Sequence, residues 1–155
     1  MLTGAIAFVF VGGMSFFLPP PPNPPSAPAT AITSRLQMPA GTQALLKRSC
    51  YDCHSNETRW PAYSHLWPAS SLMYADVSGA RKVMNFSEWP AKDDPRGARR
   101  AAGLLMASCA AMQSGLMPRH QYLMLHPDAK VTSSEAQQFC AWSTVTVAEL
   151  RKTAE

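Results

Sequence analysis

The chain has 155 residues, enough for one domain, and its first 34 residues contain no Asp, Glu, Lys or Arg. The remainder is long enough to bury roughly two-thirds of its unfolded surface and to fold alone. A composition of 46% hydrophobic and 15% charged residues excludes a disordered chain. The formal charge of +4 is spread thinly after Arg35, so we expect no nucleic-acid partner. Four cysteines are too few for a disulfide-stapled scaffold and instead indicate a site.

Residues 1–18 are predicted to form a membrane anchor or a signal segment. Residues 2–18 are an uncharged apolar run, at the short limit for a membrane-spanning helix and longer than the usual apolar core of a signal peptide. A cleavable Ala-Thr-Ala sequence stands at 29–31, far beyond the end of the run. Both interpretations direct export. We therefore expect a protein anchored on the periplasmic side of the cytoplasmic membrane, or a soluble periplasmic one if the leader is cleaved.

Residues 19–34 are predicted to be a linker, and residues 35–155 the folded domain. Seven prolines fall between Pro19 and Pro28. Such a run favours extended polyproline II structure, which would act as a semi-rigid spacer between the membrane and the domain. Plain disorder is the alternative.

The folded domain is predicted to be all-α, because no sustained apolar–polar alternation with hairpin turns occurs in it. Asp94 followed by Pro95 predicts the start of one helix, and the capping box Thr132–Glu135 predicts another. The β-branched run Thr144–Val147 weakens the second of these towards its end. The helices expected are Thr42–Cys53, Pro68–Val83, Pro95–Gly115 and one that follows Thr132. The last two carry apolar stripes at helical spacing, namely Ala98, Ala101, Ala102, Leu105, Cys109 and Met112, and Ala136, Phe139, Cys140, Val147 and Leu150.

Cys109 and Cys140 each fall on the apolar stripe of their own helix, so both side chains should point inward. In an oxidising compartment they can form a disulfide if the helices pack antiparallel with Cα atoms within about 7 Å. The closed loop would then be stabilised by about 3 kcal/mol. Two buried thiols that act as small hydrophobic residues are the alternative.

The motif that carries chemistry is Cys50-Tyr51-Asp52-Cys53-His54, a C-x-x-C-H sequence of the kind that attaches a c-type haem. On a helix, residues at i, i+3 and i+4 share one face. Both thiols can then meet the two vinyl groups of one porphyrin while the imidazole reaches the iron from the same side. Cys50 and Cys53 are therefore the candidate attachment residues, and His54 is the candidate proximal ligand of one covalent haem c.

Two other kinds of site also use paired cysteines with a nearby histidine. A zinc site would need four ligands, and no second pair of cysteines stands at close spacing. A redox-active dithiol would call for a strand–helix context of the thioredoxin type, and no such pattern precedes the motif.

The stretch that begins CYDCHSNETRWPAYS resembles the haem-binding domain family of bacterial exported c-type cytochromes. The family pattern continues here as Asp76–Arg81, Asn85–Trp89, Gly115–Pro118, Tyr122 and His126-Pro127. The resemblance covers about residues 45–142. It implies covalent haem binding by a small, cytochrome c-like helical domain wrapped round the group, but it implies little about physiological role.

Met117 is the predicted sixth ligand of the iron. The sequence Gly115-Leu116-Met117-Pro118 follows a predicted helix end, which places a thioether on a loop. A Met-Pro loop in the C-terminal half also resembles the distal-ligand loop of small class I cytochromes c. The alternatives for the sixth ligand are the remaining histidines, His65, His120 and His126.

Further residues admit more than one interpretation. Trp60, Tyr63, Trp67, Phe86 and Trp89 would form either a wall around the haem or an ordinary aromatic core. A set of arginines, Arg81, Arg96, Arg99 and Arg100, would pair with haem propionates, dock an acidic partner, or lie on a solvated helix face.

The function expected is that of an exported monohaem c-type cytochrome that transfers electrons to or from periplasmic or membrane redox proteins. No acid–base pair, nucleophile triad or phosphate loop is present in the sequence, so we do not expect an enzyme. The alternatives are a haem-based sensing or gas-binding module, a subunit of a larger redox complex and, more remotely, a peroxidase. The sixth coordination position distinguishes them, because a protein ligand there favours electron transfer and an open position favours the others.

Overall fold

The computed structural model describes residues 16–153 of the chain. The predicted anchor at residues 1–18 therefore lies almost wholly outside the described residues. Of its last three residues, Phe17 forms an isolated antiparallel bridge with Leu66. Among the helices of residues 16–153, none is both long enough and apolar enough to span a membrane.

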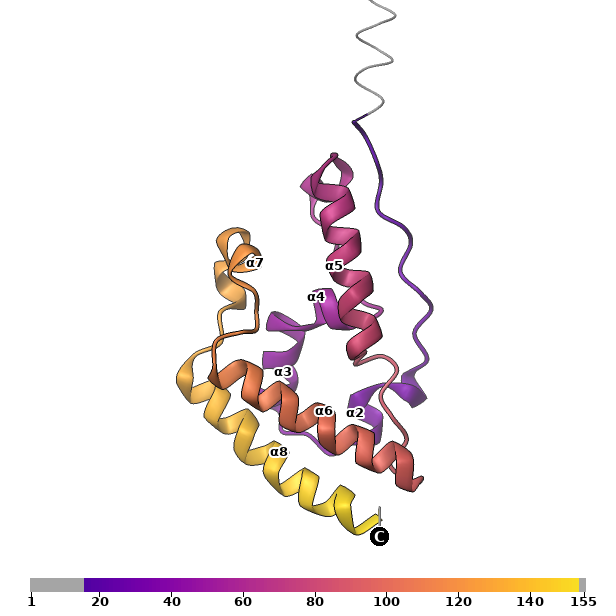
Figure 1. Cartoon of the computed structure of the whole chain (residues 1–155), viewed down its shortest axis with the longest axis vertical. Coiled ribbons are helices and arrows are strands. Elements are labelled where there is room, and N and C mark those ends of the chain that lie inside the picture. Colours follow the sequence, from indigo (N-terminus) through magenta and orange to yellow (C-terminus); the bar gives the residue numbers. More distant parts are fainter. Residues whose placement is uncertain (1–15, 154–155) are drawn as a thin grey trace, which may run out of the picture.

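The described part of the chain is helical and contains no strand beyond that one bridge, which confirms the all-α prediction (Figure 1). In Figure 1, α6 and α8 lie side by side at the base, α5 stands above them, and α7 stands on the other side from α5. The helices are α2 (Ile32–Arg35), α3 (Ala40–Ser49), α4 (Tyr51–His54), α5 (Ala69–Val83), α6 (Pro95–Gln113), α7 (His120–Leu125) and α8 (Ser133–Thr153). Three short 3-10 turns join them, η1 (Pro28–Thr30), η2 (Ala62–His65) and η3 (Pro127–Ala129).

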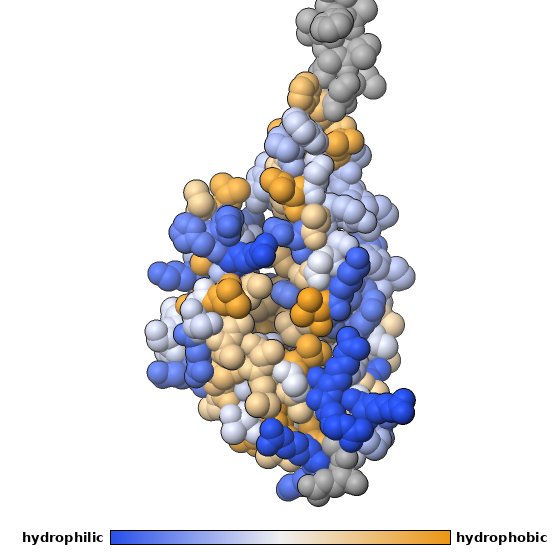
Figure 2. All heavy atoms as spheres, viewed as in Figure 1, coloured by the Kyte–Doolittle hydropathy of each residue, from blue (hydrophilic) through white to orange (hydrophobic). Residues whose placement is uncertain are grey.

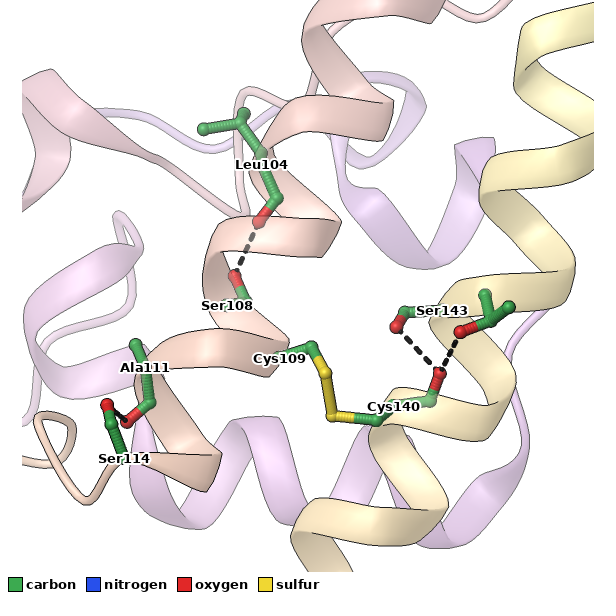
Figure 3. Close-up of a disulfide and its surroundings, with 8 residues drawn as sticks. Leu104, Ser108, Cys109, Ala111, Ser114, Cys140 and Ser143 are labelled. Carbon is green, nitrogen blue, oxygen red and sulfur yellow. Dashed lines mark hydrogen bonds between the residues drawn. A yellow bond between two sulfur atoms is a disulfide. The ribbon is translucent and has the colours of Figure 1, made fainter.

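The α6–α8 pair forms much of the core along the two predicted stripes. From α6 these residues are buried: Ala98, Ala101, Ala102, Leu105 and Met112. From α8 they are Ala136, Phe139, Cys140, Val147 and Leu150. A Cys109–Cys140 disulfide links the two helices, with Cα atoms 5.1 Å apart (Figure 3). The structure thus favours the disulfide over two free thiols.

Both predicted helix starts are confirmed. The Asp94 carboxylate accepts hydrogen bonds from the backbone N–H groups of Arg96 (3.3 Å) and Gly97 (2.7 Å). Gly97 is required there, because a Cβ at this position would lie only 2.0 Å from the carbonyl oxygen of Ala91. Thr132 and Glu135 form the capping box. The Thr132 N–H donates to Glu135 (2.8 Å), and the Glu135 N–H donates to the Thr132 hydroxyl (3.2 Å).

The helix predicted over Thr42–Cys53 is broken at Cys50, so that part of the prediction is wrong. Cys50 has φ −130°, and it separates α3 from α4. The break accompanies the burial of Tyr51, whose ring stacks on Phe86 with 5.3 Å between centroids. Apolar packing of one aromatic side chain therefore reorients the motif relative to the preceding helix.

The residues before Arg35 pack against the domain to a greater extent than a spacer would. Ile32 is fully buried, and its N–H donates to the carbonyl of Phe86 (2.8 Å). Asn23 donates to the carbonyl of Thr58 (2.8 Å), and it also accepts from Arg81 (2.8 Å). We therefore count the segment from Asn23 onward with the folded domain. The spacer prediction for residues 19–34 took no account of these contacts.

Candidate functional site

The site is a cavity of about 300 Å³ between α4, α5 and the chain that enters α7. Figure 2 shows a hollow in the face between α5 and α7. Its walls contain all four predicted site residues, Cys50, Cys53, His54 and Met117. A second cavity of about 480 Å³ adjoins it on the side of Tyr63 and His126. The two cavities share five lining residues, namely Asp52, Cys53, Asp76, Arg119 and Tyr122.

The α5 helix forms one wall of the first cavity with small side chains. The α5 residues that line it fall at helical spacing, at Ala75, Asp76, Gly79, Ala80 and Val83. A Cβ added at Gly79 would meet no protein atom within 4 Å. This helix face therefore leaves room for a flat ligand to approach its backbone.

His54 is held with one ring nitrogen committed to the protein. Its Nδ1 donates to the carbonyl of Met84 (3.1 Å), and its ring packs edge-on against Phe86 with 6.3 Å between centroids. An imidazole that donates from Nδ1 presents Nε2 as its ligating atom, which is the arrangement usual for metal-bound histidine. Burial lowers the pKa of His54, against the opposing effect of the carbonyls of Met84 and Ala80. The neutral ring is the form that binds a metal.

Cys50 and Cys53 are the unpaired cysteines of the described residues. Burial, with a smaller contribution from Cys53, raises the pKa of Cys50 to about 12. Burial, followed by the charge of Asp52, raises the pKa of Cys53 to about 11. Both side chains are therefore protonated thiols at neutral pH, on the wall of an apolar cavity.

Met117 lines the same cavity from the loop between α6 and α7. Gly115 follows the C-cap of α6 with φ +70°, a left-handed conformation that favours glycine. The chain then turns back, and the Met117 N–H donates to the carbonyl of Ala111 (3.2 Å). The loop predicted from the Gly-Leu-Met-Pro sequence is thus present, and it brings Met117 to the cavity that His54 lines.

Polar side chains hold the α7 segment over the cavities, and sequence reasoning gave them no such role. The Tyr122 hydroxyl donates to Asp52 (2.9 Å), which also accepts from Arg59 (3.2 Å). Arg119 forms an ion pair with Asp76 of α5 (2.9 Å). Burial, followed by the charge of Asp52, raises the pKa of Tyr122, so its hydroxyl stays protonated and can donate. The partners of each pair lie far apart in the sequence, so no local sequence pattern indicates that they meet.

The other histidines are placed differently. His65 stacks on Phe17 at 5.6 Å and lines neither cavity. His120 begins α7 at an exposed position and lines neither cavity. His126 lines the second cavity, where its Nε2 hydrogen-bonds to the Tyr63 hydroxyl (2.7 Å) and its ring stacks on Tyr122 at 4.3 Å.

A family model described as a haem-binding domain matches residues 9–145. The chain belongs to this family. No curated protein and no solved structure gives a significant match to it.

The walls of the haem-binding domain fit an apolar macrocycle. Large aliphatic side chains on the cavity walls are left mostly exposed by the protein alone: Leu72 by 66%, Val83 by 68% and Leu125 by 63%. Exposed apolar surface gathered around a hollow is typical of a ligand-binding site. The first cavity also has a histidine and a thioether in its walls, which are groups that can ligate a haem iron.

The aromatic residues form a core and a surface, with one of them on a cavity wall. Phe86 and Trp89 are buried, with their rings stacked at 5.8 Å behind Tyr51. Tyr63 lines the second cavity, whereas Trp67 lines neither cavity and is about half exposed. The core interpretation therefore holds for Phe86 and Trp89, and the wall interpretation is wrong for them.

Arg81 stabilises the loop that follows the motif and lines neither cavity. Its guanidinium donates to the carbonyl of Ser55 (2.7 Å) and to the Thr58 hydroxyl (2.7 Å). Two other arginines line the cavities: Arg119 lines both, and Arg59 lines the second. Sequence reasoning singled out neither of them.

Proposed function

We propose that the chain is an exported monohaem c-type cytochrome that transfers electrons from the periplasmic side of the membrane. The observation that carries the proposal is the meeting of both motif thiols, an oriented imidazole and a thioether in the walls of one apolar cavity. A haem bound there would supply an iron that cycles between two oxidation states. The residues of the chain determine how it is held and at what potential it works.

Cys50 and Cys53 would hold the group covalently. Each S–H would add across one vinyl double bond of the haem, so that a C–S bond would form and the hydrogen would pass to the neighbouring carbon, with no net oxidation. This requires free thiols, and the structure has both cysteines unpaired while Cys109 and Cys140 are bonded to each other.

His54 and Met117, which line the same cavity, would ligate the haem iron. The Met84 carbonyl fixes the His54 ring, and the α6–α7 loop carries Met117. Methionine as the second ligand gives a higher potential than a second histidine would. Contact of the haem with the walls of α5 and α7 would limit the access of water, which would raise the potential further. An iron ligated by both side chains would transfer electrons with little rearrangement and would leave no position for a gas.

The covalent link is tested by expressing the full chain in a host that matures c-type cytochromes. We expect haem that acidified organic solvent cannot extract from the wild type. Replacement of Cys50 and Cys53 by serine should make it extractable, and replacement of Cys109 and Cys140 by serine, the matched control, should not. Fully matured wild type without covalent haem would refute the proposal.

The distal ligand is tested by Met117→Ala, with Met124→Ala as control, since Met124 lies on α7 with its side chain 70% exposed. The weak far-red absorption of a ferric methionine-ligated haem should be present in the wild type and in the control. It should vanish in Met117→Ala, whose ferrous form should also bind carbon monoxide more readily. A wild type that lacks this band, or that binds carbon monoxide freely, would favour the sensing function.

A further inference from the structure

One end of the domain carries exposed apolar side chains in an arrangement that the haem site does not explain. The tip, as we call this set, consists of Phe16, Phe17, Leu18, Leu66 and Trp67, each of which is 45–55% exposed. None of the five lines either cavity at the haem site. In Figure 2 the apolar surface at this end adjoins the point where the described chain begins.

Two short segments build the tip and hold one another in register. The Leu18 N–H donates to the carbonyl of His65 (2.8 Å), and the Trp67 N–H donates to the carbonyl of Phe16 (2.9 Å). The rings of Phe16 and Trp67 lie in contact, with centroids 6.1 Å apart. This backbone pairing keeps residues 65–67 next to residues 16–18.

Charge is absent from both parts of the tip and from the sequence around them. No Asp, Glu, Lys or Arg occurs in residues 1–34 or in residues 60–75. Soluble domains seldom expose clustered aromatic and aliphatic side chains without charges among them. Such clusters suit the boundary of a bilayer, where aromatic residues are enriched and charges are costly.

The occupant of this surface follows from chain continuity. Residues 16–18 are the end of the uncharged apolar run 2–18. If a bilayer holds that run, its last residues lie at the membrane–water boundary, and the backbone pairing brings Leu66 and Trp67 to the same depth.

We infer that the tip inserts into the lipid headgroup region, so that the domain rests on the bilayer with the N-terminal end of α5 facing it. This inference rests on the proposed membrane location and goes beyond it. A proline-rich spacer would hold the domain away from the lipid. The packing of residues 23–34 along the domain leaves little free chain for such a spacer.

The test uses the full chain in vesicles that contain a phospholipid with a diazirine near the glycerol end of one acyl chain. After irradiation, mass spectrometry locates the lipid adducts. We expect adducts within residues 60–75 as well as within the N-terminal run, and none on α8. The double change Leu66→Asp with Trp67→Asp should lower the adduct yield in 60–75 several-fold. The control Val145→Asp, at an exposed apolar residue of α8, should leave that yield unchanged.

Each alternative outcome overturns the inference in a distinguishable way. Adducts in the N-terminal run but not in 60–75 would show a domain held off the membrane, with the anchor intact. Absence of adducts throughout, with recovery of a soluble chain, would remove the membrane location as well. Absence in 60–75 together with dimers in detergent that the Asp changes dissociate would assign the tip to a second copy of the chain. Circular dichroism of each variant is the control that checks whether it is folded.

Discussion

The substitution Gly79→Ala tests most directly whether the haem lies against α5. Gly79 is in the interior of this helix and lines the cavity of Cys50 and His54, and an added Cβ meets no protein atom within 4 Å. Gly103 occupies a matching position in α6, away from the cavity, and its added Cβ likewise meets no protein atom. The effects of the two substitutions on stability should therefore differ only if a ligand in the cavity contacts Gly79.

The expected magnitudes follow from this comparison. Alanine in place of a mid-helix glycine raises the free energy of unfolding by roughly 0.5–1 kcal/mol. Gly103→Ala should show this gain in full. At Gly79 the added methyl group would press on a porphyrin packed against the helix, and overpacking of that kind costs about 1–3 kcal/mol. The holoprotein with Gly79→Ala should therefore be at least about 1 kcal/mol less stable than the one with Gly103→Ala.

Urea unfolding of the two purified holoproteins, followed by circular dichroism and by the Soret band, measures this difference. Equal stabilisation by the two changes would show that nothing packs against Gly79, and the assignment of the haem to this cavity would be wrong. A gain for Gly103→Ala together with a loss for Gly79→Ala would place the group against α5.

Three further predictions concern the scaffold. Replacing Cys109 and Cys140 together by alanine should lower the free energy of unfolding by about 3–4 kcal/mol on the loop-entropy model for their separation of 31 residues; an unchanged urea midpoint would contradict the disulfide. Tyr63→Phe removes the hydroxyl that bonds His126, which should cost about 1 kcal/mol in the same assay; the same change at an exposed tyrosine is the control. Hydrogen bonds from the Thr132 N–H and then from Arg48 lower the pKa of Glu135 below its ordinary 4.5. The wild type should therefore have a higher free energy of unfolding than Glu135→Gln at neutral pH, and this difference should disappear as the pH falls through the lowered pKa. A pH-independent difference would refute this.

The sequence was most informative where local chemistry decides the structure. Asp94 and the capping box at Thr132 mark helix starts because side chains beside them satisfy free backbone N–H groups. The β-branched run Thr144–Val147 did not end α8, since Val147 is buried in the core to which α6 and α8 both contribute. Packing in the folded core thus outweighed the weak helix propensity of those residues.

Features that depend on distant contacts were missed. The break at Cys50 accompanies the packing of Tyr51 on Phe86, and Ile32 enters the core by pairing with the same segment. The site itself was predicted in part. The C-x-x-C-H motif and Met117, which line one cavity, could be singled out because each is a local sequence pattern, whereas the hydrogen bond of Tyr122 to Asp52 joins residues 70 apart in the sequence.

The Cys109–Cys140 disulfide encloses every residue that the α7 side contributes to the cavities. Met117, Tyr122 and His126 all lie within the covalent loop that it closes. The covalent bond joins α6 and α8 close to where this segment leaves one helix and enters the other, so changes within residues 114–132 keep the buried residues of α6 and α8 in place. Because closing a somewhat longer loop costs little extra entropy, the segment is an exchangeable cassette. A protein engineer could therefore graft a different distal ligand, or an open pocket, between the two cysteines while the His54 side stays intact.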